Sequence, residues 1–290
     1  MRAVSLDDRG EPVLVDLPEP SGPGELVRVL ACGLCGSDVE KLGRAPAGTV
    51  LGHEVEGLLE DGTRATVAHR VPCGECERCL AGHESTCAEF ATMRISPGGF
   101  AERLRATHVF PLPDSVGELD GIWIEPLACV LRAAELVPRG RTLVVGSGAV
   151  GLLWVQVLLR RGHDVTVSDP RADRLEHALA LGATAADRVD SAILTAPPGV
   201  GDALDRLEPG GTLLVFAAPE GMIPLELDAV YRRELTLVGS RSATPRHFEA
   251  AIDLLPSVDL PPVTRLPLEE FTEGVRLYRS GESLKVVFTP

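Results

Sequence analysis

Three side chains of a zinc-binding kind lie close together near the N-terminus: Cys35, His53 and Glu54. A thiolate, an imidazole and a carboxylate can share one tetrahedral shell around Zn²⁺. Three protein ligands leave the fourth position for water or substrate, which is typical of a catalytic zinc rather than a structural one. The alternative for these residues alone is a buried thiol with an unrelated surface imidazole.

A second group consists of four cysteines within fifteen residues, namely Cys73, Cys76, Cys79 and Cys87. Four thiolates complete a tetrahedral shell and leave no open position, so this spacing predicts a structural zinc. The alternatives are two disulfides, free thiols, or a zinc ribbon that binds nucleic acid. The N-terminus has no secretory signal, so we expect a cytoplasmic protein whose clustered cysteines bind metal.

A glycine-rich segment forms the third chemical feature: Gly146-Ser147-Gly148-Ala149-Val150-Gly151. An apolar strand precedes it and an apolar helix follows, which is the context of a dinucleotide-binding loop. We expect Gly146 to allow the tight turn, Gly148 to let the backbone approach a pyrophosphate, and Gly151 to let helix pack on strand. The helix N-terminus, beginning at Ala149 and Val150, would offer amides and a positive dipole to the phosphates.

An acidic residue ends the next apolar strand, at Asp169, 23 positions after Gly146. In a dinucleotide site this carboxylate would accept both adenosine ribose hydroxyls and repel a 2′-phosphate, so it predicts NAD rather than NADP. The alternative for Asp169 is a helix N-cap or a turn residue.

The elements that must position these residues differ between two parts of the chain. Short alternating segments suggest strands at 3–6, 13–15 and 25–30, whereas strands and helices alternate after residue 142. Alternation of that kind implies parallel strands covered on both faces, so the fold class is α/β. A last strand at 284–288 is expected to rejoin the first part.

Composition narrows the classes of partner. The chain has 290 residues, which suggests two domains, and a formal net charge of −14. That charge disfavours nucleic acid and anionic membrane surfaces. The uncharged segment 142–159 is interrupted by glycines and fits a strand, turn and helix better than a membrane span. We therefore expect a small-molecule substrate.

The order of the motifs resembles the zinc-dependent medium-chain alcohol dehydrogenase family, and most of all its polyol and threonine dehydrogenase branch. The resemblance rests on Cys35-Gly36-Ser37-Asp38, Gly52-His53-Glu54, the four-cysteine lobe, the segment that begins at Glu125, and the glycine loop with Asp169. It implies a GroES-like β-barrel catalytic domain at 1–118 and 259–290, with a zinc lobe at 73–87. A Rossmann domain at 119–258 would be inserted between these parts.

The same resemblance implies roles for individual residues. Cys35 and His53 would hold a catalytic zinc, Glu54 would be a ligand or exchangeable partner, and Glu125 would contact the metal directly or through water. Ser37 would belong to a proton relay. The family also implies Arg174 near the adenine ribose, two zinc ions per chain, NAD as cofactor, and a homodimer or homotetramer.

The expected reaction is NAD-dependent oxidation of a secondary alcohol, which could be a polyol, a sugar or a hydroxy compound. The segments between Cys35 and His53, and between Glu54 and the cysteine lobe, are shorter than is usual in the family, so the substrate stays open. Two alternatives also stay open: a zinc-independent C=C or quinone reductase of the same superfamily, and a non-catalytic sensor that binds NAD and zinc.

Overall fold

The computed structural model describes residues 1–217 and 222–290 and divides the chain into two compact units. Unit 1 consists of residues 1–128 with 243–290, and unit 2 of residues 129–242. Unit 1 thus extends beyond the predicted domain boundaries at 118 and 259. The reason is local packing. The Gly121 amide donates to Glu56 Oε2 at 2.7 Å, and Phe248 stacks on Phe110 with ring centroids 5.1 Å apart.

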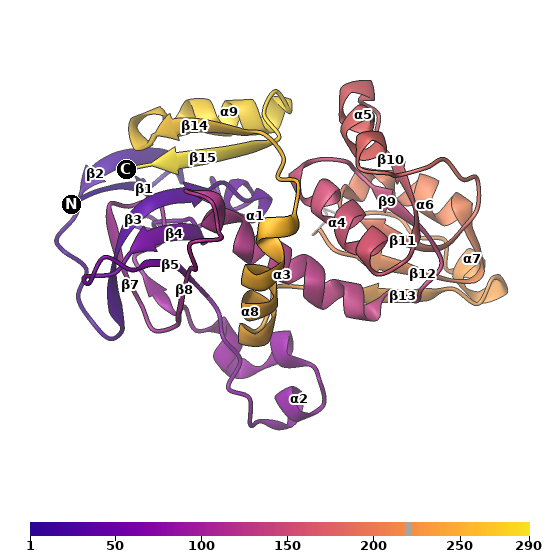
Figure 1. Cartoon of the computed structure of the whole chain (residues 1–290), viewed down its shortest axis with the longest axis horizontal. Helices are drawn as coiled ribbons and strands as arrows, with labels where there is room; N and C mark the ends of the chain where they lie inside the picture. The colour runs from indigo at the N-terminus through magenta and orange to yellow at the C-terminus, as the bar shows by residue number, and fades with distance from the viewer. Residues whose placement is uncertain (218–221) are drawn as a thin grey trace. The chain divides into compact units, whose positions relative to one another are not determined.

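Unit 1 is built around an eight-stranded sheet with the strand order β14-β15-β3-β4-β5-β8 (Figure 1). Strand β7 also pairs with β3, and β6 pairs with β7, while β1 and β2 form a separate two-stranded sheet. The bounds of these strands are β1 (Arg2–Leu6), β2 (Pro12–Asp16), β3 (Glu25–Gly33), β4 (Glu54–Leu58), β5 (Arg64–Val67), β6 (Ile95–Ser96), β7 (Arg103–Ala106), β8 (Val109–Pro111), β14 (Val263–Pro267) and β15 (Lys285–Thr289).

The C-terminal strand completes this sheet. Strand β15 pairs antiparallel with β3, so that Val287 lies opposite Gly33 and Phe288 opposite Cys32. Phe288 also packs edge-on against Phe100 and stacks on Phe271 at the start of α9, with ring centroids 5.4 and 4.6 Å apart. These aromatic contacts hold the C-terminal strand in the core of unit 1, which also contains Val4 and Leu6 of β1.

Short helices connect the strands of unit 1, and the cysteine lobe extends from its strands as a small loop around α2 (Figure 1). Helix α3 begins in unit 1 and ends in unit 2. The helical bounds are α1 (Gly36–Val39), α2 (Glu77–Leu80), α3 (Ile124–Ala133), α8 (Pro245–Leu254), α9 (Phe271–Ser280) and the 3₁₀ turns η1 (Glu84–Thr86), η2 (Ala88–Ala91), η3 (Asp120–Trp123), η6 (Leu255–Ser257) and η7 (Leu268–Glu270).

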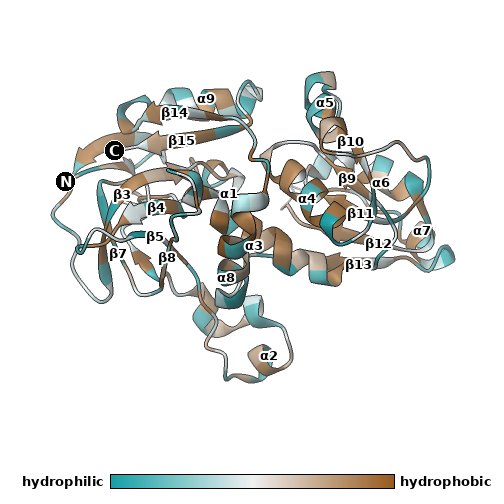
Figure 2. Cartoon of the chain, viewed as in Figure 1, coloured by the Kyte–Doolittle hydropathy of each residue, from teal (hydrophilic) through white to brown (hydrophobic). Residues whose placement is uncertain are grey.

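Unit 2 is a five-stranded parallel sheet with the order β10-β9-β11-β12-β13, which confirms the predicted α/β class. The last three residues of each central strand are apolar, as is typical of parallel strands covered on both faces, and α4 and β11 are largely brown in Figure 2. The bounds are β9 (Arg141–Val145), α4 (Ala149–Arg160), β10 (Asp164–Ser168), α5 (Ala172–Ala180), β11 (Val189–Leu194), α6 (Val200–Arg206), β12 (Leu207–Val215), α7 (Leu227–Arg232), β13 (Thr236–Gly239), η4 (Ala134–Leu136) and η5 (Pro197–Gly199).

The strand order of unit 2 places a topological switch point beside β9. The chain passes from β9 to β10 on one side and later to β11 on the other. Ligands of open α/β sheets bind where the carboxyl ends of strands diverge in this way. The glycine-rich loop that follows β9 is therefore at the position where a dinucleotide would bind.

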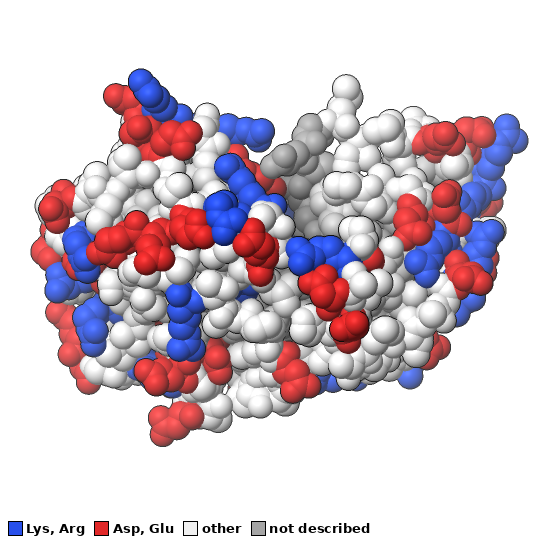
Figure 3. Space-filling model, turned by 90° about the horizontal axis from the view of Figure 1, so that it is seen from above, with Lys and Arg blue, Asp and Glu red and all other residues white. Residues whose placement is uncertain are grey.

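The surface of the molecule carries charges of both signs. Acidic and basic side chains are interspersed over the face seen in Figure 3. None of the helices in ranges 1–217 and 222–290 has the length and apolar character needed to cross a bilayer.

Candidate active site and cofactor loop

Cys35, His53 and Glu54 converge in unit 1. Their metal-binding atoms all lie within 4.8 Å of one another. Cys35 is the N-cap residue of α1, whereas His53 immediately precedes β4 and Glu54 is the first residue of that strand. Ser37 Oγ donates a hydrogen bond to Cys35 Sγ at 3.4 Å. The turn after β3 and the first residues of β4 thus bring together side chains that are eighteen positions apart.

Asp38 fixes the orientation of the His53 ring. Its buried carboxylate lies 3.3 Å from His53 Nδ1 and accepts the backbone N–H groups of Cys35 and Gly52 at 3.2 and 3.3 Å. Burial lowers the pKa of His53, but the negative charges of Asp38 and Cys35 outweigh burial and raise this pKa well above its ordinary value. With Nδ1 facing Asp38, Nε2 is the nitrogen available to a metal.

Glu54 is paired with a buried cation. Its carboxylate forms an ion pair with Lys285 Nζ, which also donates to the Leu34 carbonyl at 3.2 Å and lies 5.5 Å from the Trp123 ring centroid. Burial lowers the pKa of Lys285, but the negative charge of Glu54 and the other groups around it raise this pKa by more than burial lowers it. The pKa of Lys285 is therefore above its ordinary value. Sequence reasoning missed Lys285, since 231 positions separate it from Glu54.

Glu125 belongs to a second group of donors in unit 1. The metal-binding atoms of His53, His69 and Glu125 also lie within 4.8 Å of one another. Glu125 is in the first turn of α3, and His69 follows the end of β5. His69 lies outside all of the motifs that the sequence shows. The thiolate, imidazole and carboxylate donors of both groups are those that zinc accepts, so the residues present fit this metal.

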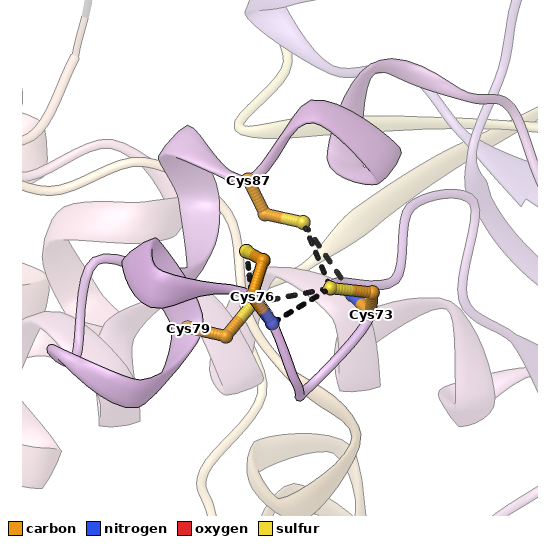
Figure 4. Close-up of side chains that lie close together, drawn as sticks. All are labelled: Cys73, Cys76, Cys79 and Cys87. Carbon is orange, nitrogen blue, oxygen red and sulfur yellow. Dashed lines mark hydrogen bonds between the residues drawn. The ribbon is translucent and has the colours of Figure 1, made fainter.

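The four cysteines of the lobe surround a common point (Figure 4). The Sγ separations are 3.9 Å for Cys73–Cys79, 3.6 Å for Cys76–Cys79 and 3.6 Å for Cys87–Cys73. A tetrahedral zinc with Zn–S bonds of about 2.3 Å requires sulfur separations of about 3.8 Å, whereas a disulfide requires about 2.05 Å. The lobe therefore fits a zinc ion, and its cysteines are free rather than paired in disulfides.

Backbone amides favour thiolates at Cys73 and Cys87, whereas burial raises the pKa of the Cys79 thiol to about 12. The Cys73 N–H donates to Cys87 Sγ at 3.5 Å, and the Cys76 N–H donates to Cys73 Sγ at 3.4 Å. The bond from Cys73 lowers the pKa of the Cys87 thiol to about 6. Since zinc binds thiolates, a thiol that loses its proton near neutral pH is a suitable ligand.

The glycine loop of unit 2 has the expected backbone geometry. Gly146 has a φ of +94°, which only glycine adopts readily. A Cβ on Gly151 would lie 1.9 Å from the Gly146 carbonyl oxygen, so α4 can pack on the loop only without a side chain there. At Gly148 the nearest atom to such a Cβ is Arg174 Nη1, at 3.8 Å. A methyl group would therefore fit at Gly148 without displacing any backbone atom.

Asp169 follows β10, and its carboxylate accepts the Ser147 N–H at 2.8 Å and the Arg171 N–H at 3.0 Å. These bonds connect the glycine loop to the end of β10. Asp169 therefore also has the structural role of a turn residue, which is one of the alternatives given for it above. The N-cap of α5 is Arg171, so Asp169 does not cap that helix itself. The guanidinium of Arg174, in the first part of α5, lies beside Gly148 as noted above.

Comparisons with known proteins identify the family of this chain. Residues 22–114 match the family model described as the alcohol dehydrogenase GroES-like domain. D-altritol 5-dehydrogenase of Agrobacterium fabrum is 31% identical over 300 residues, which cover 88% of each chain.

Two solved structures are similar over the full chain. Galactitol-1-phosphate dehydrogenase from Escherichia coli is 26% identical, with 100% of both chains covered and a TM-score of 0.84. A dehydrogenase from Sinorhizobium meliloti 1021 with bound NADP is also 26% identical, with 100% of this chain and 99% of that chain covered and a TM-score of 0.84. With its donor sites, glycine loop and full-length relatives, this chain belongs to the zinc-dependent medium-chain alcohol dehydrogenase family.

Proposed function

We propose that this protein transfers a hydride between a secondary alcohol and a nicotinamide cofactor, with a zinc ion in unit 1. The observation that supports this most is the buried cluster around His53, where Cys35, Glu54 and the Asp38 carboxylate meet. Bound zinc would act as a Lewis acid and make the hydroxyl of the substrate more acidic. Cys35 and His53 are the proposed anchors of the ion, with Glu54 or Glu125 as the carboxylate ligand.

Ser37 is the proposed proton carrier. Its hydroxyl is half-buried and bonds to Cys35 Sγ, so it lies beside the proposed metal position. A hydroxyl there can accept the proton that the alcohol loses and pass another to solvent. Asp38 holds His53, and the carbon-bound hydrogen of the alcohol leaves as hydride to the nicotinamide, whose redox chemistry belongs to the cofactor. The ketone is the product.

The cofactor is proposed to bind at the loop between β9 and α4, with its pyrophosphate at the amides that start at Ala149 and Val150. We propose NAD as the preferred form, because the carboxylate of Asp169 would repel a 2′-phosphate. The competing choice is NADP, which the relative from Sinorhizobium meliloti binds. The neighbouring guanidinium groups of Arg171 and Arg174 could accept that phosphate.

Steady-state kinetics with both cofactors test this preference. Wild type should have a higher kcat/KM with NAD, and Asp169→Ala should narrow the ratio by about tenfold, which is about 1.4 kcal/mol. Glu176→Ala, which removes an exposed carboxylate of α5, is the matched control and should leave the ratio unchanged. A wild type that already prefers NADP would contradict the role proposed for Asp169.

The substrate class is proposed to be polyols, sugars or related hydroxy compounds, because relatives are named for altritol and galactitol-1-phosphate. Turnover of a panel of these compounds with NAD, followed by the absorbance of NADH, tests the proposal. Cys35→Ser should lose turnover on every compound that wild type oxidises. Equal inactivity of both proteins over the panel would favour the non-catalytic sensor instead.

Metal analysis separates the proposal from the zinc-independent reductase. We propose two zinc ions per chain, one at the cluster around His53 and one at the four-cysteine lobe. A single zinc that is lost when Cys76 and Cys79 are replaced by serine would favour the zinc-independent alternative.

A homo-oligomer and a cytoplasmic location complete the proposal. Strand β13 lies at the end of the five-stranded sheet within the described ranges, and Leu237 on it is partly exposed. Two such edges could pair across a symmetry axis to form a dimer, which light scattering of wild type and Leu237→Lys would test.

Metal-binding thiols persist in reducing compartments, which supports a cytoplasmic location.

A further inference from the structure

His69 lies against the proposed metal site, although it belongs to none of the sequence motifs described above. It follows β5, and its carbonyl accepts the Arg94 N–H at 2.9 Å, which holds the backbone of this segment in place. Its side chain is 13% exposed. A largely buried imidazole on a fixed backbone can be a metal ligand, because little conformational freedom is lost when an ion binds.

The geometry of His69 matches that of a ligand. Its Nδ1 lies 3.9 Å from Glu125 Oε1, and its ring centroid lies 4.5 Å from that of His53 at an interplanar angle of 46°. Nitrogen and oxygen donors about 2.0–2.2 Å from a tetrahedral zinc are about 3.3–3.6 Å apart. The three donors of this group lie within 4.8 Å of one another, so small side-chain rotations would let them share one ion.

The charge around Glu54 favours this second group. Glu54 is held by the buried ammonium of Lys285, and a cation at this carboxylate would have to approach that ammonium. In the group of His69, the carboxylate is that of Glu125, and the other donors are two imidazoles. His53 belongs to both groups, so a metal can exchange one carboxylate for the other without leaving His53.

We propose that His69 is a zinc ligand, and that His53 is shared by two adjacent zinc positions. One position is formed with Cys35 and Glu54, and the other with His69 and Glu125. This inference rests on the proposed function, because it requires that the site around His53 binds zinc. It adds an imidazole to a site for which only Cys35, His53 and the two glutamates were expected.

Zinc affinity is the first test and needs no turnover. Competition with a chromophoric chelator should resolve two zinc ions per chain in wild type. His69→Ala and His69→Gln should each weaken the affinity for one of these zinc ions more than about 100-fold. A loss of that size distinguishes a direct ligand from a residue that only holds a ligand in place, whose loss costs about 10–100-fold in affinity. His177→Ala, which removes an exposed imidazole of α5, is the matched control and should change neither affinity.

The second test uses a chain without the thiolate. Cys35→Ser should still bind a second zinc at His53, His69 and Glu125, though more weakly, and Cys35→Ser/His69→Gln should bind only the zinc of the cysteine lobe. Co²⁺ provides a spectroscopic readout, since His69→Gln alters the ligand field of the catalytic ion and therefore its visible d–d bands. Far-ultraviolet circular dichroism confirms that each variant is folded.

The outcomes separate this inference from the function on which it rests. Two zinc ions and turnover in wild type, with unchanged zinc affinity and Co²⁺ spectrum in both folded His69 variants, would overturn the role of His69 alone. A single zinc in wild type, held by the cysteine lobe, would overturn both. If Cys35→Ser and Cys35→Ser/His69→Gln had the same reduced affinity for the second zinc, the second zinc position would also be overturned.

Discussion

At the scale of single residues, the site depends on buried charges that neutralise one another. Glu54 and Lys285 are both almost fully buried and form an ion pair, and Glu54 is the main charge that acts on Lys285. Removing one member of such a pair leaves the other charged in a poorly solvated place, which costs far more than an exposed ion pair contributes. The chain has only two lysines, Lys41 and Lys285, so the effect of removing the buried one on stability can be compared with the effect of removing the exposed one.

We expect Lys285→Met to lower the free energy of unfolding of unit 1 by about 3–5 kcal/mol, because Glu54 would lose its counter-charge. Urea unfolding in a Trp154→Phe background measures this, since Trp123 then reports alone and lies beside Lys285. Lys41→Met removes the exposed lysine and should change stability by less than about 0.5 kcal/mol. Equal effects of the two substitutions would refute the importance of the buried pair.

The pH dependence of this effect follows from the raised pKa of Lys285. A lysine whose folded-state pKa exceeds its unfolded value contributes stability that is complete below the unfolded pKa and is lost as pH rises through the folded one. The difference between wild type and Lys285→Met should thus be constant from about pH 6 to pH 9 and shrink only above about pH 10.5. A difference that vanished between pH 6 and 9 would show that another group is responsible.

At the scale of elements, the turn from β9 into α4 illustrates two uses of glycine. Gly151 is required by packing, since a Cβ would lie 1.9 Å from a backbone oxygen. Gly148 has room for a methyl group within the protein, where the nearest atom is 3.8 Å away. Its proposed purpose is therefore the approach of the cofactor rather than the fold.

We expect Gly151→Ala to destabilise unit 2 by about 1–3 kcal/mol or more, because the loop must move away from α4. Gly148→Ala should fold as wild type does but bind NAD about 10–100-fold more weakly, a loss of about 1.4–2.8 kcal/mol. Unfolding followed by Trp154 fluorescence, which reports on α4, and titration with NADH measure the two quantities. Wild-type affinity in Gly148→Ala would refute the proposed pyrophosphate position.

At the scale of the whole molecule, the chemistry is divided between the two units. All proposed metal ligands belong to residues 1–128, whereas the glycine loop, Asp169 and Arg174 belong to residues 129–242. One tryptophan is present in each unit, Trp123 in the first and Trp154 in the second.

Zinc removal should therefore affect the units unequally. A strong chelator is expected to lower the unfolding midpoint reported by Trp123, because metal that binds only the folded state stabilises it. NAD at about 100 times its Kd should instead raise the midpoint reported by Trp154, because it should increase the free energy of unfolding of unit 2 by up to about 2.7 kcal/mol. Single-tryptophan variants, Trp154→Phe and Trp123→Phe, separate the two signals. Equal shifts of both midpoints would mean that the units unfold as one.

The sequence by itself determined the features that are encoded locally. Each strand and helix of the parallel sheet is encoded within a few consecutive residues, and the glycine loop and the four-cysteine lobe are each encoded within about fifteen. Over such short distances, periodicity and spacing reflect backbone geometry directly. Strand β12 shows the limit of this reasoning. Its residues 209–211, Pro-Gly-Gly, have the composition of a turn, yet they form an irregularity within the strand, because pairing with β11 is present on both sides of them.

Only the tertiary structure decided which charges meet around the site. Lys285 reaches Glu54 because β15 pairs with β3, His69 reaches Glu125 because the end of β5 lies near the start of α3, and Asp38 is turned toward His53 by the cap of α1. A pairing between residues tens or hundreds of positions apart leaves no periodic pattern in the chain. It depends on how strands assemble and on the need of each buried charge for a partner, and both are properties of the folded molecule.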